Sequence, residues 1–319
     1  MTGFTLVGQK YGAQIHAPFY FNKGRTMLEF KKVEIEDIDI YKKFSQKHRE
    51  LSCENSFVNL LVWQCKYNNM MAVCDGQLII KSGEGFNESF RLPFGDDFEK
   101  GIQLINEYCQ GKTPKFWAPE GPLFEKFRQK FDGIYEFKEQ RDAFDYIYLT
   151  EDLANLAGKK YHGKRNHINA FTKKWEWHYE PITAENVKDV KGCAERWYSE
   201  NLQRLDSIME CEKNGINTIL ENMEKLSVKG GAIYVEGRVV AFTLGSPIND
   251  TIFDIHIEKA LNDYAEAYTV INREFARNEL QNYKYINRED DLGLEGLRKA
   301  KLSYKPEILL KKYYCRPKG

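Results

Sequence analysis

One stretch of basic residues has the chemistry of an anion-binding surface. Residues 153–175 contain no Asp or Glu, and Lys, Arg and His are densest over 158–167. A helix through this stretch puts three basic side chains on one face and a fourth beside it, namely Lys160, Lys164 and His167, and then Arg165. Such a face neutralises phosphates, and an Arg side chain grips a phosphate or carboxylate through two hydrogen bonds. A solvated helix face is the competing interpretation.

A second chemically active group alternates along a strand predicted to begin near residue 251. Asp254, His256 and Glu258 fall on one face of such a strand, because successive side chains point to opposite faces. His256 has the chemistry of a general base, and Glu258 would orient it or pair with Lys259. A solvent-exposed polar face is the alternative. One His and two carboxylates without a second cluster do not predict a metal site.

The richest polar cluster lies near the C-terminus, over residues 285–304. Four carboxylates are followed within a few residues by three cations, in the order Glu289, Asp290, Asp291, Glu295, Arg298, Lys299 and Lys301. Gly293 and Gly296 let the backbone bend or approach a ligand closely. The cluster is interpreted either as a charge-neutralising network or as a site where cations meet an anionic substrate while a carboxylate fixes an amine.

The elements that must position these residues form two hairpin-rich sheets with flanking helices. Asp75-Gly76 and Glu236-Gly237 separate pairs of apolar runs, as two-residue hairpin turns do. The spacing predicts helices over 98–109 and 161–175 and strands over 143–149 and 283–287. We therefore expect a mixed α/β chain with two similar units, over 27–150 and 151–319, and an N-terminal appendage over 1–26.

Length and composition set limits on the class of protein. The 319 residues are 42% hydrophobic, enough for real cores, and 47 Lys and Arg balance 47 Asp and Glu. This balance argues against a histone-like protein or an acidic tail, but it leaves room for a local basic groove. No apolar run is long enough for a transmembrane helix. Seven Cys with no CxxC pair predict reduced thiols and a cytoplasmic location.

Five separated motifs, in order, resemble a bacterial family related to the C-terminal domain of phosphatidylglycerol lysyltransferase. The resemblance extends over residues 27–314, and its motifs lie at 145–148, 160–171, 230–245, 255–260 and 286–306. It implies two tandem GNAT-like acyltransferase folds packed together. Relatives such as the Fem-type peptidoglycan aminoacyltransferases and leucyl/phenylalanyl-tRNA–protein transferase take an aminoacyl group from tRNA. The resemblance therefore implies an aminoacyltransferase that uses aminoacyl-tRNA and no tightly bound cofactor.

The resemblance also marks candidate site residues in the second unit. Those expected to act on the acyl group or the amine are His256, Glu258, Lys259, Glu289 and Asp291. Those expected to bind the donor or to neutralise its charge are Lys160, Lys164, Arg165, Asn166, Asn287, Arg288, Arg298, Lys299, Lys301 and Tyr304. Because an aminoacyl ester is already activated, positioning and oxyanion stabilisation supply most of the rate, and no Ser/His/Asp set is required.

Two alternatives to the tRNA-dependent enzyme stay open. The first is a small-molecule N-acyltransferase that uses acyl-coenzyme A. The Q/R-x-x-G-x-G/A loop expected of such enzymes is absent after the 251–260 strand, where the sequence reads ALNDYAEA. The second is a catalytically silent module that binds a peptide or RNA. The acceptor is left open among a small molecule, a peptide and a lipid headgroup, because the chain has no counterpart of the membrane flippase part of the full lysyltransferase.

Overall fold

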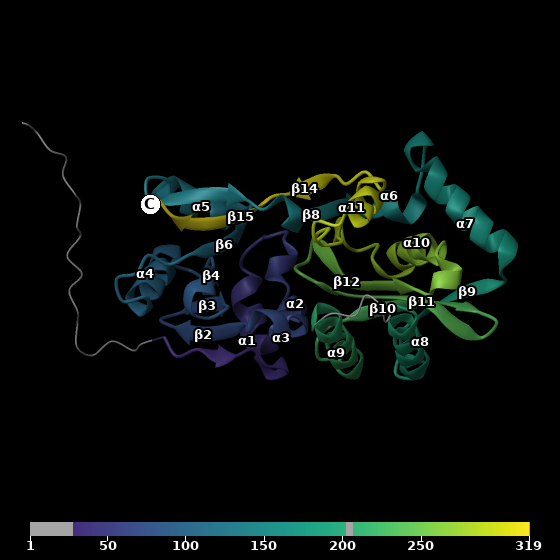
Figure 1. The fold of residues 1–319 in the computed structure, drawn as a ribbon, viewed down its shortest axis with the longest axis horizontal. Helices are drawn as coiled ribbons and strands as arrows, with labels where there is room; N and C mark the ends of the chain where they lie inside the picture. The colour runs from purple at the N-terminus through teal and green to yellow at the C-terminus, as the bar shows by residue number, and fades with distance from the viewer. Residues whose placement is uncertain (1–27, 202–206, 319) are drawn as a thin grey trace, which may run out of the picture.

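A computed structural model describes residues 28–201 and 207–318, which form two mixed β-sheets with helices around them (Figure 1). The first sheet has the strand order β1-β2-β3-β4-β6-β15-β7, with β5 paired to β3. The second has the order β14-β8-β13-β12-β11-β10-β9. The appendage expected over residues 1–26 lies outside the described residues.

The N-terminal part of the chain supplies most of the first sheet. Its strands are β1 Lys31–Lys32, β2 Met70–Cys74, β3 Gln77–Ser82, β4 Ser89–Arg91, β5 Phe94–Gly95, β6 Phe116–Pro119 and β7 Tyr135–Glu139. Its helices are α1 Ile38–Ser45, α2 Phe57–Val62, α3 Gln64–Tyr67, α4 Phe98–Tyr108 and α5 Pro122–Phe131.

The C-terminal part of the chain supplies the second sheet and one strand of the first. Its strands are β8 Asp145–Leu149, β9 Trp177–Pro181, β10 Lys229–Val235, β11 Arg238–Pro247, β12 Ile252–Ala260, β13 Tyr285–Asn287, β14 Ile308–Leu310 and β15 Lys312–Pro317. Its helices are α6 Thr150–Asn155, α7 His162–Lys174, α8 Val187–Glu200, α9 Ser207–Glu221, α10 Ala267–Glu279 and α11 Glu295–Leu302.

Both predicted hairpins form, and their turns explain why. Asp75 and Gly76 join β2 to β3 with φ of 47° and 72°, and Glu236 and Gly237 join β10 to β11 with φ of 50° and 72°. Two consecutive positive φ angles define the turn whose twist matches that of the flanking strands, and Gly adopts the second angle without steric cost.

The two sheets share one topology. A hairpin, a third antiparallel strand, a crossover helix and a parallel strand follow one another as β2-β3-β4-α4-β6 in the first sheet. The second sheet repeats this order as β10-β11-β12-α10-β13. The expectation of two similar units is thereby confirmed at the level of the fold, although the sequence shows no direct repeat.

The chain crosses between the two sheets more than once. β8 lies in the second sheet although it belongs to the expected first unit, and β15 returns to the first sheet between β6 and β7. One buried hydrophobic cluster includes residues of both halves, such as Leu60 of α2 and Ile216 of α9. This shared core accounts for tight packing of the halves, while the unit boundaries at 26 and 150 stay predictions.

A disulfide joins the halves as well, between Cys65 of α3 and Cys211 of α9, whose Cα atoms lie 5.9 Å apart. This finding departs from the reduced thiols expected from the sequence. The two Cys are 146 residues apart and meet only because α9 packs beside α2 and α3. No spacing rule identifies such a pair, since connectivity cannot be deduced from cysteine positions alone.

Candidate functional site

The candidate site lies where β12 and β13 part. The parallel pairing of these strands runs from Ile252 opposite Tyr285 to Asp254 opposite Asn287, and its register goes no further. On its other side, β12 places Ile255 and then Ile257 opposite consecutive residues of β11. His256 is therefore the extra residue of a β-bulge, a feature that re-aims a side chain and leaves one residue out of the ladder.

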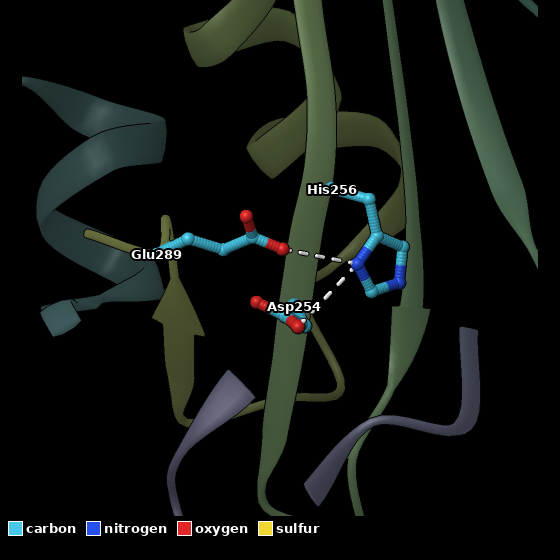
Figure 2. A group of neighbouring side chains, drawn as sticks. All are labelled: Asp254, His256 and Glu289. Carbon is cyan, nitrogen blue, oxygen red and sulfur yellow. Dashed lines mark hydrogen bonds and ion pairs between the residues drawn. The ribbon is translucent and has the colours of Figure 1, made fainter. Parts of the chain in front are cut away.

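The His256 ring faces two carboxylates (Figure 2). Its Nδ1 lies 3.3 Å from Glu289 Oε1 and 3.4 Å from Asp254 Oδ2, while its Nε2 lies 2.8 Å from Ser246 Oγ on β11. The ring is 1% exposed although the residue as a whole is half-buried, so the accessible surface at the bulge is main chain. A buried imidazole thus has both nitrogens engaged beside an accessible backbone.

Asp254 is the most buried carboxylate of this group. It is 0% exposed, and among the described residues its Oδ2 has only a long 3.5 Å contact with Asn59 Nδ2 of α2 in addition to the histidine. Its Oδ1 is buried without a hydrogen-bond partner among the described residues. Burial, and then the nearby charges of Glu289 and Asp145, raise the pKa of Asp254 well above its ordinary value.

Glu289 stands on a tightly held loop after β13. Its φ is 57°, and its N–H donates to Asn287 Oδ1 at 2.7 Å while its carbonyl accepts from Tyr146 N–H at 3.1 Å. The Lys301 ammonium donates to the carbonyl of Arg288 at 2.5 Å and also to that of Asp290. Burial lowers the pKa of Lys301, and its role here is to bind the loop from inside.

The Asp291 carboxylate is engaged in hydrogen bonds and ion pairs within the protein. It is 0% exposed, and it accepts from Arg298 Nε at 2.8 Å, Tyr146 Oη at 2.5 Å and Arg141 Nη1 at 3.2 Å. Desolvation acts to raise the pKa of Asp291, but the hydrogen bonds from Arg298 and Tyr146 outweigh it and keep that pKa below its usual range. Asp291 and Arg298 therefore form the internal charge network that the sequence left open as one of two interpretations.

A cationic group lies next to the carboxylates. Arg288 Nη2 pairs with Glu258 Oε1 at 2.6 Å, and the Arg288 guanidinium lies 4.8 Å from the centre of the Tyr304 ring. Lys164 of α7 places its ammonium 3.6 Å from the centre of the same ring. Burial, and then the charge of Arg288, lower the pKa of Lys164 to about 8. Two cations thus lie on one aromatic ring beside a single carboxylate that pairs with Arg288, and Arg288 Nη1 is buried without a partner among the described residues.

Some candidates of the basic helix are engaged elsewhere. Arg165 Nη1 donates to the carbonyls of Leu156 at 2.5 Å and Gly158 at 2.7 Å, which binds α7 to the end of α6. Lys160 pairs with Asp152 at 2.9 Å. Asn166 contacts the ring of His162 at 3.2 Å. The helix projects from one end of the molecule (Figure 1) and remains a cationic surface.

Two further candidates lie away from the carboxylates. Lys259 pairs with Glu212 of α9, and its ammonium lies 3.9 Å from the centre of the Trp197 ring of α8. It therefore points toward α8 and α9, whereas Glu258 contacts Asn272 of α10. Lys299 is exposed on α11. The structure therefore gathers eight of the sequence candidates at one corner of the second sheet, namely Lys164, His256, Glu258, Asn287, Arg288, Glu289, Lys301 and Tyr304.

Sequence reasoning missed the two buried charged residues that support this corner, Asp145 and Lys312. Asn287 Nδ2 donates to Asp145 Oδ2 at 3.1 Å, and Asp145 pairs with Lys312 of β15 at 2.8 Å with both side chains fully buried. Desolvation would lower the pKa of Lys312, but Asp145 holds it well above its ordinary value. The alternation of residues along the 251–260 strand identified Asp254 as a candidate. No pattern in the sequence indicates that Asp145 and Lys312 form an ion pair.

The described helices include none that is long and apolar enough to cross a bilayer. Across residues 46–316 the chain matches the model of the family described as phosphatidylglycerol lysyltransferase, C-terminal. An uncharacterized protein of Mycoplasmoides gallisepticum is 28% identical over 171 residues, which are 53% of this chain and 54% of that protein. The chain thus spans about half the length of this curated relative.

Solved structures share the fold. A conserved protein of unknown function from Bacteroides thetaiotaomicron is 36% identical with a TM-score of 0.84, and the match covers 92% of this chain and 100% of that one. L-PGS from Bacillus licheniformis is 14% identical with a TM-score of 0.59, over 89% and 92% of the two chains. FemX is 9% identical with a TM-score of 0.56, over 90% and 96%.

Proposed function

The chain belongs to the phosphatidylglycerol lysyltransferase C-terminal family, and on that premise we propose that it transfers an aminoacyl group from aminoacyl-tRNA to an amine or hydroxyl acceptor. Its fold is that of the aminoacyltransferase-type acyltransferases, which is shared with L-PGS and FemX. The donor is already an activated ester, so the proposal requires no tightly bound redox or group-carrying cofactor.

One observation carries the proposal, namely the separation of charge at the end of β12 and β13. Two acidic side chains, Glu289 and the buried Asp254, lie against the His256 ring, while Arg288 and Lys164 leave a net positive charge beside Glu258. An aminoacyl ester of a nucleic acid has the same polarity, with an amine at one end and a phosphate at the other. Arg288 and Glu289 are neighbours in the chain, so the basic and acidic groups adjoin in one loop.

The basic half suits a phosphate of the donor. The Arg288 side chain is 12% exposed, and Lys164 lies on the same Tyr304 ring as its guanidinium. A guanidinium and an ammonium together provide directed donors and a point charge for a phosphate. The cationic surface of α7 extends from this point and supplies a path for the acceptor stem.

The acidic half suits the amine, and the bulge suits the acyl carbonyl. Glu289, whose side chain is partly accessible, would orient the transferred or attacking amine, and positioning of this kind supplies a large part of the rate of acyl transfer. The main chain at His256 lies outside the regular register of the strand, where a backbone N–H would be free to donate to a substrate oxygen. Such a donor stabilises the oxyanion that forms when the amine or hydroxyl attacks the ester.

Equilibrium binding tests the donor. The full chain is titrated with total charged tRNA and with deacylated tRNA over a range of salt, alongside Lys164→Met and the control Lys311→Met, which removes a cation of an exposed ion pair with Glu139. We expect salt-dependent binding, with the logarithmic salt slope reduced by about one in Lys164→Met and unchanged in the control. Absence of binding at low salt would exclude the tRNA donor, and a thermal shift with acetyl-coenzyme A instead would favour the acyl-coenzyme A alternative.

A further inference from the structure

From the geometry around His256 we infer that Asp254, His256 and Glu289 form a binding site for one divalent transition-metal ion, with zinc as the best fit. One ring nitrogen and one oxygen from each carboxylate all lie within 4.8 Å of one another (Figure 2). This inference goes beyond the proposed function, because the ion would bind in the absence of any donor or acceptor.

The spacing of the ligand atoms fits such an ion. In a tetrahedral zinc site with bonds of about 2.0–2.1 Å, neighbouring ligand atoms lie about 3.3–3.4 Å apart. His256 Nδ1 lies 3.3 Å from the Glu289 oxygen and 3.4 Å from the Asp254 oxygen. The two carboxylate oxygens lie within 4.8 Å of each other, so all three ligand atoms are within reach of one ion.

The orientation of the ring fits as well. Nε2 lies 2.8 Å from Ser246 Oγ, and when Nε2 carries the proton and donates it to this hydroxyl, the Nδ1 lone pair points at the two carboxylates. A hydrogen bond from the second ring nitrogen is the usual way in which a ligating His is held. Asp254 Oδ1, on a fully buried side chain, has no other partner among the described residues.

The nearest buried cations are committed to other groups. Lys301 donates to the carbonyls of the 288–290 loop, and Lys312 pairs with Asp145 and Glu54. Among the described residues, neither Asp254 nor Glu289 forms an ion pair with a Lys or an Arg. The fully buried Asp254 and the half-buried Glu289, with a single imidazole between them, therefore have room for a positive charge that the protein does not provide.

The ligand set favours the class of ion. Imidazole suits zinc and its neighbours in the first transition row, and carboxylates suit them also when no thiolate is present. Three protein ligands leave a fourth position open, which is typical of a site that binds a substrate atom or water. A neutral amine or a carbonyl oxygen is the substrate group that would take that position.

Metal titration of the full chain tests this site without any substrate. After treatment with a chelator, the protein is titrated with Zn²⁺ in competition with a chromophoric chelator, and with Co²⁺ by absorption. The variants are His256→Ala, Glu289→Gln and Ser246→Ala, and the matched control is His178→Gln, which removes an exposed His beside Glu180. Thermal unfolding of each variant establishes that it is folded.

We expect one ion per chain, a Co²⁺ spectrum without a thiolate charge-transfer band, and affinity at least tenfold weaker in His256→Ala and Glu289→Gln. Ser246→Ala keeps all three ligands but removes the hydrogen bond that orients the His256 ring. An affinity about tenfold weaker in this variant would therefore show that the orientation of the ring contributes to metal binding. Failure to bind, a thiolate band, or unchanged affinity in the folded His256 and Glu289 variants would overturn the site. None of these results depends on tRNA binding.

Discussion

The surroundings of Lys164 bring the pKa of its ammonium close to physiological pH. Its ammonium lies on the Tyr304 ring beside Arg288, and burial together with that neighbouring charge lowers its pKa to about 8. The positive charge is present below that pKa and is lost above it. If Lys164 binds a phosphate of the donor, the net charge of the basic half decreases over the same range of pH.

We therefore predict that affinity for charged tRNA falls as the pH rises from 7 to 9 at constant salt. In Lys164→Met the affinity is lower at pH 7, by roughly tenfold or less as for the loss of one phosphate contact, and its dependence on pH is flatter. Binding measured by fluorescence anisotropy at both pH values checks this. Equal pH dependence in the variant and the native protein would remove Lys164 from the donor site.

Residue chemistry was partly foreseeable from the sequence. The basic stretch, the polar strand and the 285–304 cluster each identified residues that meet at one corner. The different fates of Glu289 and Asp291 were not foreseeable, because both are carboxylates in the same loop. In the folded protein the two differ in their surroundings. Glu289 has a positive φ and faces His256, whereas Asp291 accepts from Arg298 and Tyr146 and holds the loop.

At the scale of elements, the start of α5 depends on a buried carboxylate. Glu50 is 4% exposed, and its Oε1 accepts from the N–H of Leu123 at 3.2 Å. Burial raises the pKa of Glu50 to about 7, against an ordinary value of 4.5. The folded protein therefore binds more protons than the unfolded chain between these pH values, so this group's contribution to stability decreases as the pH rises through that window.

We predict that Glu50→Gln raises the free energy of unfolding at pH 8 by on the order of 2–3 kcal/mol relative to the native protein, and changes it little near pH 4.5. The Gln carbonyl still accepts from Leu123, so the hydrogen bond is kept while the buried charge is removed. Urea unfolding at the two pH values measures the difference. A pH-independent effect of the substitution would contradict the assignment of the buried charge to Glu50.

Element prediction from the sequence succeeded where local rules act alone. Both Gly-containing hairpin turns and the helix at 98–108 follow from turn chemistry and apolar spacing. Strict alternation along 254–258 does not hold, because the bulge at His256 inserts one residue opposite Leu244 and Gly245. A bulge depends on the partner strand, and the sequence of a single strand does not reveal it.

At the scale of the whole molecule, contacts between the halves hold the site in place. Lys312 of the first sheet pairs with Asp145 of the second, Asp145 accepts from Asn287, and Asn287 accepts from the Glu289 backbone. The first two steps join residues far apart in the chain, so periodicity and spacing do not reveal them. The exchange of β8 and β15 between the sheets is hidden from the sequence for the same reason.

The Cys65–Cys211 disulfide provides a prediction at this scale. Because it cross-links residues 146 positions apart, oxidised protein should lose about 2–4 kcal/mol of stability in Cys211→Ser or on reduction. Thermal unfolding with and without reductant, together with peptide mapping under non-reducing conditions, measures this. Cys109→Ser, at a half-buried free thiol, is the control and should keep the sensitivity to reductant. Complete alkylation of both Cys in the native, unreduced protein would contradict the cross-link.

The central claim is that the corner formed by β12, β13 and α7 transfers an aminoacyl group from tRNA. The most direct measurement is a transfer assay that supplies radiolabelled total aminoacyl-tRNA and fractionated cell extract as acceptor. If the protein transfers the aminoacyl group, we expect the label to leave tRNA and to appear in one acceptor fraction with the native protein. His256→Ala should abolish this transfer, and Lys311→Met should leave it unchanged. Label that stays on tRNA while the tRNA binds tightly to the protein would contradict the claim and identify a binding module instead.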